Sequence, residues 1–366
     1  MNKSKPIIRA KMPELDAIRG IAILAVVFYH DLFWSSNLAG LTGVSRLAVN
    51  ATRFGWLGVN LFFVLSGFLI TGILEDSKTS PHFFRRFYIR RALRILPAYY
   101  GLLLILAFAP LQNGRYLLLS FFYLSNLAPL FRISNTYPML WSLAAEEHFY
   151  LVWPLLVWFL TRRTLMWAAI VVFFTTAALR GVWFHDPLPQ GFHGFTWLVA
   201  DGFAAGAFLA LFVRDPWCTR KRLAWIAAWS ASAAILALIL AAPFGILTRF
   251  RFAGAVFMLS TVNLLFVAVL GFALLAATRT PKAAIKIAAL TFFGDISYGL
   301  YLIHWLIFIS YDAIVARYLG STYNFTDNFR LLAIRFCISF GAATFLAWFS
   351  RRYCEEPFLR MKSRFS

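Results

Sequence analysis

An arginine and a histidine stand eleven positions apart in the first long apolar run of the sequence, residues 17–35. Arg19 lies at the start of the run and His30 lies within it. On an α-helix, residues eleven apart lie within about 20° of each other around the axis and are separated by ~16 Å along it. Because ionisable side chains are costly inside a bilayer, two of them on one face predict that this face lines a functional site.

Other apolar segments carry ionisable residues at a similar predicted depth. Glu146 and Glu147 stand within 140–160, and His304 stands within 290–311. If the first run crosses outward, the rise of a helix puts His30, the glutamates and His304 all ~8–10 Å below the outer surface. A neutral histidine near a carboxylate suits removal of a proton from a hydroxyl, or acceptance of an acyl group.

Several of these residues also have structural explanations. Adjacent glutamates point about 100° apart, so only one of Glu146 and Glu147 faces a given ligand, and one of them could pair with an arginine such as Arg19 or Arg335. Hydrogen bonding between helices is the favoured interpretation of His304. The sequence leaves the choice between the two glutamates open.

Two more residues are further candidates with competing structural roles. Asp16 stands three residues before Arg19 at a helix start, where a local ion pair accounts for both. Ser66 precedes a glycine, and small residues allow helices to pack closely in a bilayer. We keep both as candidates, together with Tyr298 and His304.

The composition predicts a membrane protein made of helices. Apolar residues make up 61% of the 366 residues and charged residues 14%, whereas a soluble domain carries about 25% charged residues. The segments between the apolar runs are short, so we expect one integral membrane domain over 1–366. Cys218, Cys337 and Cys354 show no metal or redox spacing, so we expect free thiols and no metal.

The apolar runs predict an all-α bundle of about ten transmembrane helices. The expected spans are 17–35, 55–75, 95–111, 140–160, 165–183, 195–213, 223–242, 254–275, 290–311 and 330–350. The segment 116–131 is short and leads into a polar stretch with a proline, so we expect a re-entrant or surface segment there.

The net charge of +20 is spread over the ends of the apolar runs, which indicates membrane topology and anionic lipid rather than nucleic acid. If 116–131 does not cross, most of the basic loops fall on one side. If it crosses, that balance inverts. The positive-inside rule therefore predicts ten spans with both termini in the cytoplasm.

One arginine cluster is denser than topology requires. It consists of Arg85, Arg86, Arg90, Arg91 and Arg94. Pro97 follows, which predicts that the cluster forms a short helix meeting a span. Arg91 and Arg94 share a helix face, and guanidinium groups suit phosphate, so these two are the best candidates for an anionic ligand. Together with His30, the cluster suggests acyl transfer from a phosphate-bearing donor to an alcohol.

Six segments, in order along the chain, resemble the acyltransferase 3 family of membrane O-acyltransferases. They are Leu15-Asp16-Ala-Ile-Arg19-Gly20 with His30, Phe62-Phe63-Val-Leu-Ser66-Gly67, Arg90-Arg91-Ala-Leu-Arg94-Ile-Leu-Pro97, Trp141-Ser142-Leu-Ala-Ala-Glu146-Glu147-His148-Phe149-Tyr150, Ser297-Tyr298-Gly299-Leu-Tyr301-Leu-Ile-His304 and Glu355-Glu356-Pro357-Phe358.

The resemblance implies an enzyme of the bacterial inner membrane that takes an acyl group, often acetyl, from cytoplasmic acyl-CoA. The acceptor would be a hydroxyl of a glycan or glycolipid on the far side. His30 is then the catalytic histidine, and Arg91 and Arg94 contact the CoA phosphates, with Arg90 and Arg19 as further donor contacts. His148 stands where the family usually has glutamine. No hydrolase-like domain follows the last span, so we expect any relay partner to be separate.

Two questions stay open at this stage. A transporter or flippase would also carry polar groups in mid-membrane, and thioester consumption would separate it from an acyltransferase. Base catalysis and a covalent acyl-histidine both require His30 in the same place.

Overall fold

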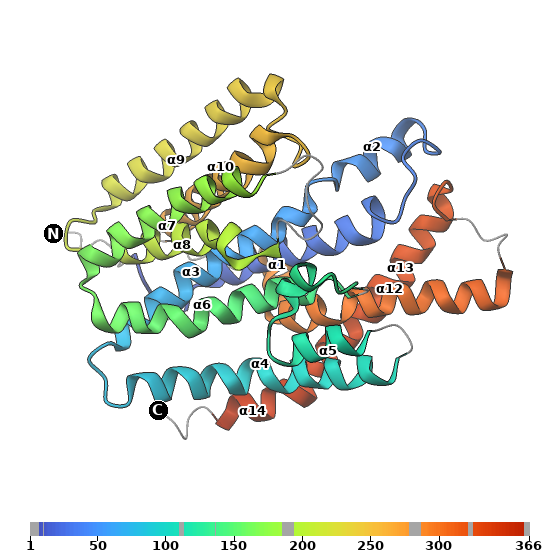
Figure 1. The fold of residues 1–366 in the computed structure, drawn as a ribbon, viewed down its shortest axis with the longest axis horizontal. Coiled ribbons are helices and arrows are strands. Elements are labelled where there is room, and N and C mark those ends of the chain that lie inside the picture. The colour runs from blue at the N-terminus through green and yellow to red at the C-terminus, as the bar shows by residue number, and fades with distance from the viewer. Residues whose placement is uncertain are drawn as a thin grey trace. The chain divides into compact units, whose positions relative to one another are not determined.

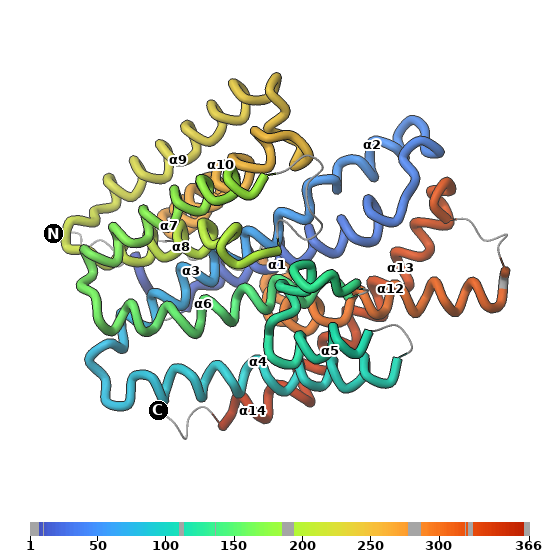
Figure 2. Tube along the Cα trace, viewed as in Figure 1, coloured from blue at the N-terminus to red at the C-terminus, as the bar shows by residue number. Residues whose placement is uncertain are grey.

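The computed structural model describes residues 7–9, 11–109, 113–135, 137–184, 194–277, 287–320 and 325–361. Within these ranges the protein is all-helical, with 82% helix and no strand. Figure 1 labels the helices and Figure 2 traces the path of the chain. The predicted all-α class is confirmed.

A helix lies over each of the ten predicted spans. These helices are α1 (Pro13–Phe28), α3 (Gly58–Ser77), α4 (Phe83–Phe108), α6 (Leu140–Phe159), α7 (Arg162–Trp183), α8 (Ala200–Phe212), α9 (Arg220–Ala241), α10 (Phe252–Ala277), α12 (Ser297–Leu319) and α13 (Phe329–Phe349). Shorter elements connect or extend them: η1 (Tyr29–Phe33), α2 (Gly43–Ala51), η2 (Gly55–Leu57), α5 (Gly114–Phe121), η3 (Ser125–Phe131), η5 (Thr196–Leu198), η6 (Ala242–Phe244), α11 (Ala288–Asp295), η9 (Ser350–Glu355) and α14 (Glu356–Arg360).

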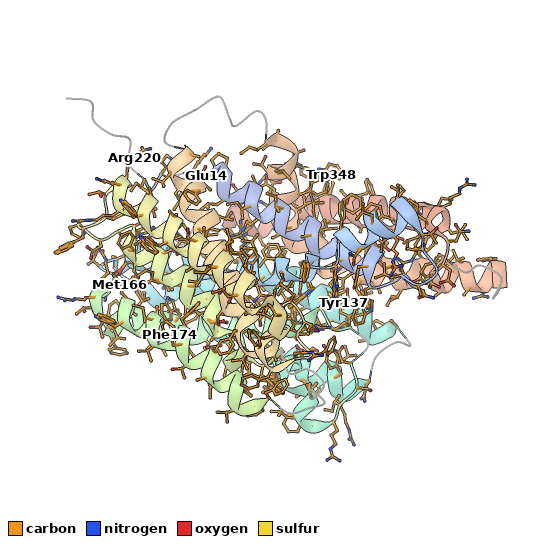
Figure 3. The ribbon with its side chains drawn as sticks, turned by 90° about the horizontal axis from the view of Figure 1, so that it is seen from above. Glu14, Tyr137, Met166, Phe174, Arg220 and Trp348 are labelled. Atoms are coloured by element: carbon orange, nitrogen blue, oxygen red, sulfur yellow. The ribbon has the colours of Figure 1, made fainter. Side chains whose placement is uncertain are left out.

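Seven helical segments of the described chain are long and apolar enough to cross a membrane. They cover every predicted span except 17–35, 140–160 and 195–213. Large apolar side chains face outward from these helices; Phe174 on α7 is 67% exposed and Trp348 on α13 is 41% exposed (Figure 3). An outer surface of this kind is suited to hydrocarbon rather than water. The chain is an integral membrane protein, and the number of its crossings stays a prediction.

The arginine cluster does not form a separate short helix, so that prediction is wrong. α4 runs without interruption over Phe83–Phe108 with Pro97 inside it. Proline is tolerated in membrane helices because groups on neighbouring helices satisfy the backbone around it. In the same region, the Tyr298 hydroxyl of α12 donates a hydrogen bond of 2.9 Å to the Ile95 carbonyl, so α12 contacts α4 in the turn before Pro97.

Two other segments differ from their predicted bounds. The apolar run 290–311 is divided, because α11 ends at Asp295 and α12 begins at Ser297, whose hydroxyl donates to the Gly294 carbonyl at 2.8 Å. The segment 116–131 forms α5, of 8 residues, and η3, of 7 residues. Either element is much shorter than the ~20 residues that a helix needs to cross a bilayer.

The chain divides into two compact units, each assembled from separate stretches. Unit 1 contains Met1–Asp16, Asn60–Phe87 and Asn113–Ala288, and unit 2 contains Ala17–Val59, Tyr88–Gln112 and Ala289–Ser366. In unit 1, α3 and α8 approach so closely that a side chain at Gly67 would meet the Phe203 carbonyl. Close packing therefore accounts for the glycine that follows Ser66. In unit 2, α12 packs against α13.

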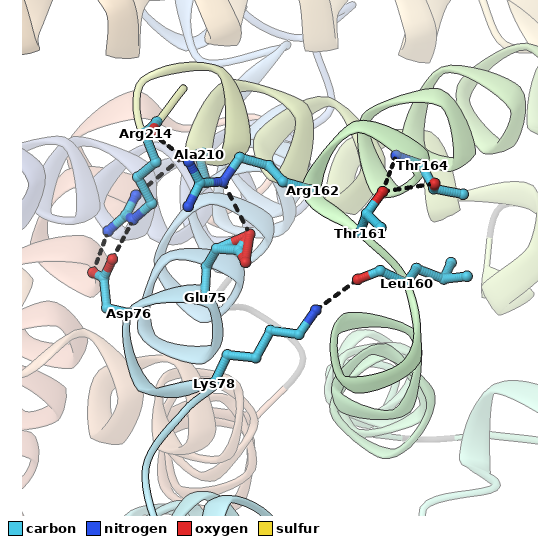
Figure 4. A network of polar contacts seen from close by, with 9 residues as sticks. All are labelled: Glu75, Asp76, Lys78, Leu160, Thr161, Arg162, Thr164, Ala210 and Arg214. Atoms are coloured by element: carbon cyan, nitrogen blue, oxygen red, sulfur yellow. Dashed lines mark hydrogen bonds and ion pairs between the residues drawn. The ribbon is translucent and has the colours of Figure 1, made fainter. Parts of the chain in front are cut away.

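Polar contacts join several helix ends at one end of unit 1 (Figure 4). Lys78, just after α3, donates to the Leu160 carbonyl at the end of α6 at 2.6 Å. Arg214, just after α8, binds the Asp76 carboxylate through two hydrogen bonds of 2.7 Å. The Arg162 guanidinium, at the start of α7, donates to the Arg214 carbonyl. The loops after α3, α6 and α8 therefore lie at the same end of the unit.

The contact between Lys78 and Leu160 bears on topology. Two directly bonded residues at helix ends lie on the same side of a bilayer, so the chain between them crosses an even number of times. If α4 and α6 each cross, as the sequence predicts, they supply two crossings, and a third crossing by 116–131 would separate the pair. This hydrogen bond favours the arrangement in which 116–131 does not cross.

A native cysteine can report the orientation. Cys218 lies between α8 and α9, in a loop that we predict to be cytoplasmic, and burial, followed by the nearby Asp215 carboxylate, raises the pKa of its thiol. In a variant with Cys337→Ala and Cys354→Ala, a membrane-impermeant maleimide should label Cys218 in inside-out vesicles and not in right-side-out vesicles. Labelling should quicken as the pH is raised, because only the thiolate reacts. Mass spectrometry measures the adduct, and labelling from the outer side alone would reverse the predicted orientation.

Candidate active site

His30 lies in a π-helical turn rather than in a regular α-helix. α1 ends at Phe28 and continues into η1, where the Trp34 N–H donates to the Tyr29 carbonyl at 2.8 Å. Single π-helical turns are rare and occur frequently at functional sites. His30 is partly exposed, whereas Tyr29 and Asp31 on either side of it are buried. The turn therefore presents the imidazole while its neighbours anchor the backbone. The ideal helical geometry relating Arg19 to His30 applies only as far as Phe28.

A second histidine orients the first. Nε2 of His304, which is 0% exposed, lies 3.3 Å from Nδ1 of His30. Nδ1 of His304 lies 3.0 Å from the Leu300 carbonyl, which can only accept, so this nitrogen carries the proton. Nε2 of His304 is then the acceptor for the Nδ1–H of His30. This chain of hydrogen bonds leaves the lone pair of His30 on Nε2.

Aromatic rings restrict the same imidazole. The Trp305 ring meets His30 edge-on with centroids 5.6 Å apart, and the Tyr29 ring does so at 5.1 Å. Contacts on several sides limit the rotation of the His30 ring, which favours a single orientation of Nε2.

Arg335 fixes the π-helical turn to its neighbours. This arginine on α13 is 2% exposed and forms an ion pair with Asp31, the residue after His30. It also binds both oxygens of Asp312, at 2.7 and 2.8 Å. Arg335, which the sequence suggested as a partner for a glutamate, therefore joins two aspartates.

Sequence reasoning overlooked both aspartates. The available signal was simple, because Asp31 and Asp312 are charged residues within or beside apolar runs. Each therefore required a partner of opposite charge in a region where buried charges are paired.

The arginine candidates for the donor lie in the same unit as the two histidines. On α4, Arg90 is exposed, whereas Arg91 and Arg94 are partly buried. The Tyr298 hydroxyl binds the Ile95 carbonyl, so the first turn of α12 lies against α4 beside Arg94. From Tyr298 to His304, α12 rises by ~9 Å. Less than two helical turns of α12 therefore separate the level of Arg94 from that of the histidine pair. Arg19 on α1, also partly buried, belongs to this unit.

The glutamate candidates lie in unit 1, where the structure distinguishes between them. Glu146 on α6 accepts hydrogen bonds from the hydroxyls of Ser66 and Tyr150, and the two hydroxyls lie 3.3 Å apart. The structure thus gives Ser66 a carboxylate neighbour that the sequence did not reveal. Glu147 is partly buried and points elsewhere on the surface of the helix. Asp16, at the start of α1, belongs to this unit as well.

His148 belongs to a separate polar cluster in unit 1. Its Nδ1 lies 2.7 Å from the Thr196 hydroxyl, which also accepts a 2.9 Å hydrogen bond from the Asn126 side chain. The side chain at position 148 therefore links α6 to η5, and Asn126 links η5 to η3. Across the described ranges, no group of three or more His, Cys, Asp or Glu side chains could hold a metal ion.

The comparison with protein families decides the classification. The acyltransferase 3 model, described as an acyltransferase domain, matches residues 12–352. The chain belongs to the acyltransferase 3 family. This membership places the histidine pair and the α4 arginines in a fold class whose members transfer acyl groups.

The chain is also similar to several bacterial proteins that are named as O-acetyltransferases. A peptidoglycan O-acetyltransferase of Listeria monocytogenes is 35% identical over 166 residues, which is 40% of this chain and 24% of the relative. A putative O-acetyltransferase of Staphylococcus aureus is 34% identical over 179 residues, which is 43% of this chain and 27% of the relative. A putative peptidoglycan O-acetyltransferase of Bacillus subtilis is 34% identical over 163 residues, which is 39% of this chain and 23% of the relative. The matches therefore span about a quarter of the length of these relatives. No solved structure matches the chain.

The ion pair between Arg335 and Asp31 predicts that substitution of Arg335 lowers the stability of the protein strongly. Arg335→Met leaves Asp31, which is 0% exposed, without its cation, and removing one partner of a buried pair costs about 3–5 kcal/mol. Thermal unfolding of the purified protein in lipid nanodiscs should show a clear fall in Tm. Arg330→Met, on the exposed start of the same helix, is the matched control and should change Tm little. Adding Asp31→Asn to Arg335→Met should restore part of the loss. Equal Tm values for the two arginine variants would contradict the assignment.

Proposed function

We propose that this integral membrane protein transfers an acetyl group from acetyl-CoA to a hydroxyl of a glycan or glycolipid outside the cytoplasm. Membership of the acyltransferase 3 family supports acyl transfer. The names of the relatives support an acetyl group and a glycan acceptor. The observation that carries the proposal is the hydrogen-bond chain from Leu300 through His304 to His30, because it presents a lone pair on Nε2.

In the base route, Nε2 of His30 removes the proton from the acceptor hydroxyl while the oxygen attacks the thioester carbonyl. The C–S bond breaks, the acetyl group joins the oxygen, and the imidazolium returns the proton to the CoA thiolate. His304 stabilises the transient positive charge by accepting from Nδ1–H of His30. Acid–base catalysis of this kind contributes about 10²–10⁴-fold to the rate.

In the relay route, Nε2 attacks the thioester carbonyl directly. CoA leaves as its thiolate and an acetyl-histidine forms. The acceptor oxygen then attacks the acetyl carbon, the C–N bond breaks, and the hydroxyl proton passes to the released thiolate or to water. The same orientation of His30 serves both routes, which differ in whether CoA leaves before the acceptor reacts.

The donor would bind from the cytoplasm. Arg91 and Arg94 would contact the CoA phosphates, with Arg90 and Arg19 as further contacts, and the thioester would reach the level of the histidines. Ten crossings of a bacterial inner membrane, with both termini in the cytoplasm, fit this arrangement. The distribution of basic loops and the bond between Lys78 and Leu160 support it.

The two glutamates of unit 1 receive different assignments. We assign Glu146 the role of holding the Ser66 hydroxyl, since it accepts a hydrogen bond from it. With Glu146 engaged in this way, we propose that Glu147 is the glutamate that orients a polar group.

Release of free CoA from acetyl-CoA, followed with a thiol reagent in lipid nanodiscs, tests the catalytic assignment. His30→Ala should lower turnover by about a hundredfold or more, because the group that handles the proton or the acyl is gone. His304→Ala should lower kcat by a smaller factor, since Nε2 remains but its tautomer is no longer set. Exposed His82→Ala is the control and should match the wild type.

The outcomes separate the alternatives. Turnover that survives His30→Ala contradicts the assignment of this histidine. Transport of a lipid-linked glycan with no thioester consumption would replace the acyltransferase proposal with a flippase. Radiolabelled acetyl-CoA without acceptor, quenched in acid, should label His30 in the relay route and leave it unlabelled in the base route.

A further inference from the structure

A buried glutamate lies beside the donor arginines in unit 2. Glu355 ends the π-helical turn η9 and is only 5% exposed. A Cβ at Gly299, in the first turn of α12, would lie 3.3 Å from Oε1 of Glu355. The adjacent Glu356 is different, because it forms surface ion pairs with Arg352 and Arg360 at 2.9 Å. Two neighbouring glutamates therefore have opposite surroundings.

Two arginines from different elements act on the buried carboxyl group. Arg94 of α4 and Arg351 of η9 both interact with Glu355 electrostatically. The Tyr298 hydroxyl, adjacent to Gly299, binds the carbonyl of Ile95, which follows Arg94. The turn before Pro97, the first turn of α12 and the π-helical turn after α13 therefore meet around Glu355.

Some polar atoms in the group formed by Arg94, Arg351 and Glu355 have no hydrogen-bond partner in the described part of the chain. Among the described residues, Nη1 of Arg351 and Oε1 of Glu355 are buried and have no hydrogen-bond partner. Leaving such groups unsatisfied is costly, so a bound ligand that offers an acceptor to Arg351 would be favoured. Phosphate oxygens are the acceptors that a guanidinium group matches best.

We propose that Arg351 is a third contact for the phosphates of the donor and that Glu355 is a positioning residue for Arg94 and Arg351. The negative charge of Glu355 attracts both guanidinium groups, which favours side-chain orientations that keep them near the incoming anion. With Arg91 included, three arginines and one glutamate leave a net positive site for CoA. This inference rests on the proposed function, since it extends the donor site described there.

The direction in which Glu355→Gln changes CoA binding separates a positioning role from a simple effect of charge. Glu355→Gln removes a negative charge near an anion site, so charge alone would tighten CoA binding. If Glu355 positions the arginines, the variant loses the orientation of both and CoA binding weakens, by about tenfold for a charge-assisted contact of 1.5 kcal/mol or so. KM for acetyl-CoA should rise while kcat at saturating donor stays near the wild-type value.

Binding of CoA to the full-length protein in nanodiscs is measured by calorimetry. Arg351→Gln should weaken binding about tenfold, and Arg351→Lys should recover only part of it because an ammonium lacks the guanidinium fork. The neighbouring surface pair offers matched controls, Arg352→Gln and Glu356→Gln, and both should bind CoA as the wild type does. Dephospho-CoA, which lacks the 3′-phosphate, shows whether Arg351 contacts that phosphate or the pyrophosphate. If Glu355→Gln does not fold, as judged by gel filtration, the Arg351 variants carry the test.

The outcomes distinguish this inference from the proposed function. Wild-type protein that neither binds CoA nor consumes acetyl-CoA overturns both. Wild-type protein that binds CoA, with weaker binding in Arg91→Gln and unchanged binding in Arg351→Gln, overturns only the role of Arg351. Unchanged or tighter binding in Glu355→Gln overturns the positioning role.

Discussion

The absence of water in hydrocarbon is the constraint on which the structure of this protein depends. A charged side chain that enters a bilayer needs a partner from the protein itself. Arg335 meets this requirement with Asp31 and Asp312, and the ion pair holds the π-helical turn that carries His30. In unit 1, the buried Arg180 satisfies the same requirement by pairing with Asp201 and with the Leu198 and Val256 carbonyls. Each unit therefore contains a buried arginine that is paired with a buried aspartate.

The histidine pair depends on this support. Two imidazoles in contact can share a proton in several ways, and only one arrangement leaves Nε2 of His30 available. The Leu300 carbonyl selects it, because a backbone acceptor requires a proton on Nδ1 of His304. A helical backbone group thus sets the protonation of a side chain on another helix. The site that we propose for acyl transfer in unit 2 then consists of one oriented imidazole, its buried partner and the arginines near the start of α12.

How much of this arrangement could be predicted varies from residue to residue. His30 and His304 could be placed at a similar depth because helical rise converts sequence position into height. The uninterrupted helix over Phe83–Phe108 could not be predicted, because proline ordinarily ends a helix. Pro97 is tolerated inside this helix because of packing in a membrane bundle. The contact partners of the charged residues could not be predicted either. Arg335 could have joined a glutamate or an aspartate, and Glu146 and Glu147 cannot be told apart until α3 presents Ser66 to one of them.

Composition and the period of the apolar runs determined by themselves that this protein is helical and resides in a membrane, because hydrocarbon admits few other structures. The order of the polar motifs was enough to indicate its family. Only the tertiary structure decided which side chains touch: the partner of His30, the aspartates of Arg335 and the burial of Glu355 beside an exposed Glu356. The physical reason is that a sequence states how far a residue lies along its own helix. Contacts across helices depend on how the helices are rotated and packed, which the whole chain determines together.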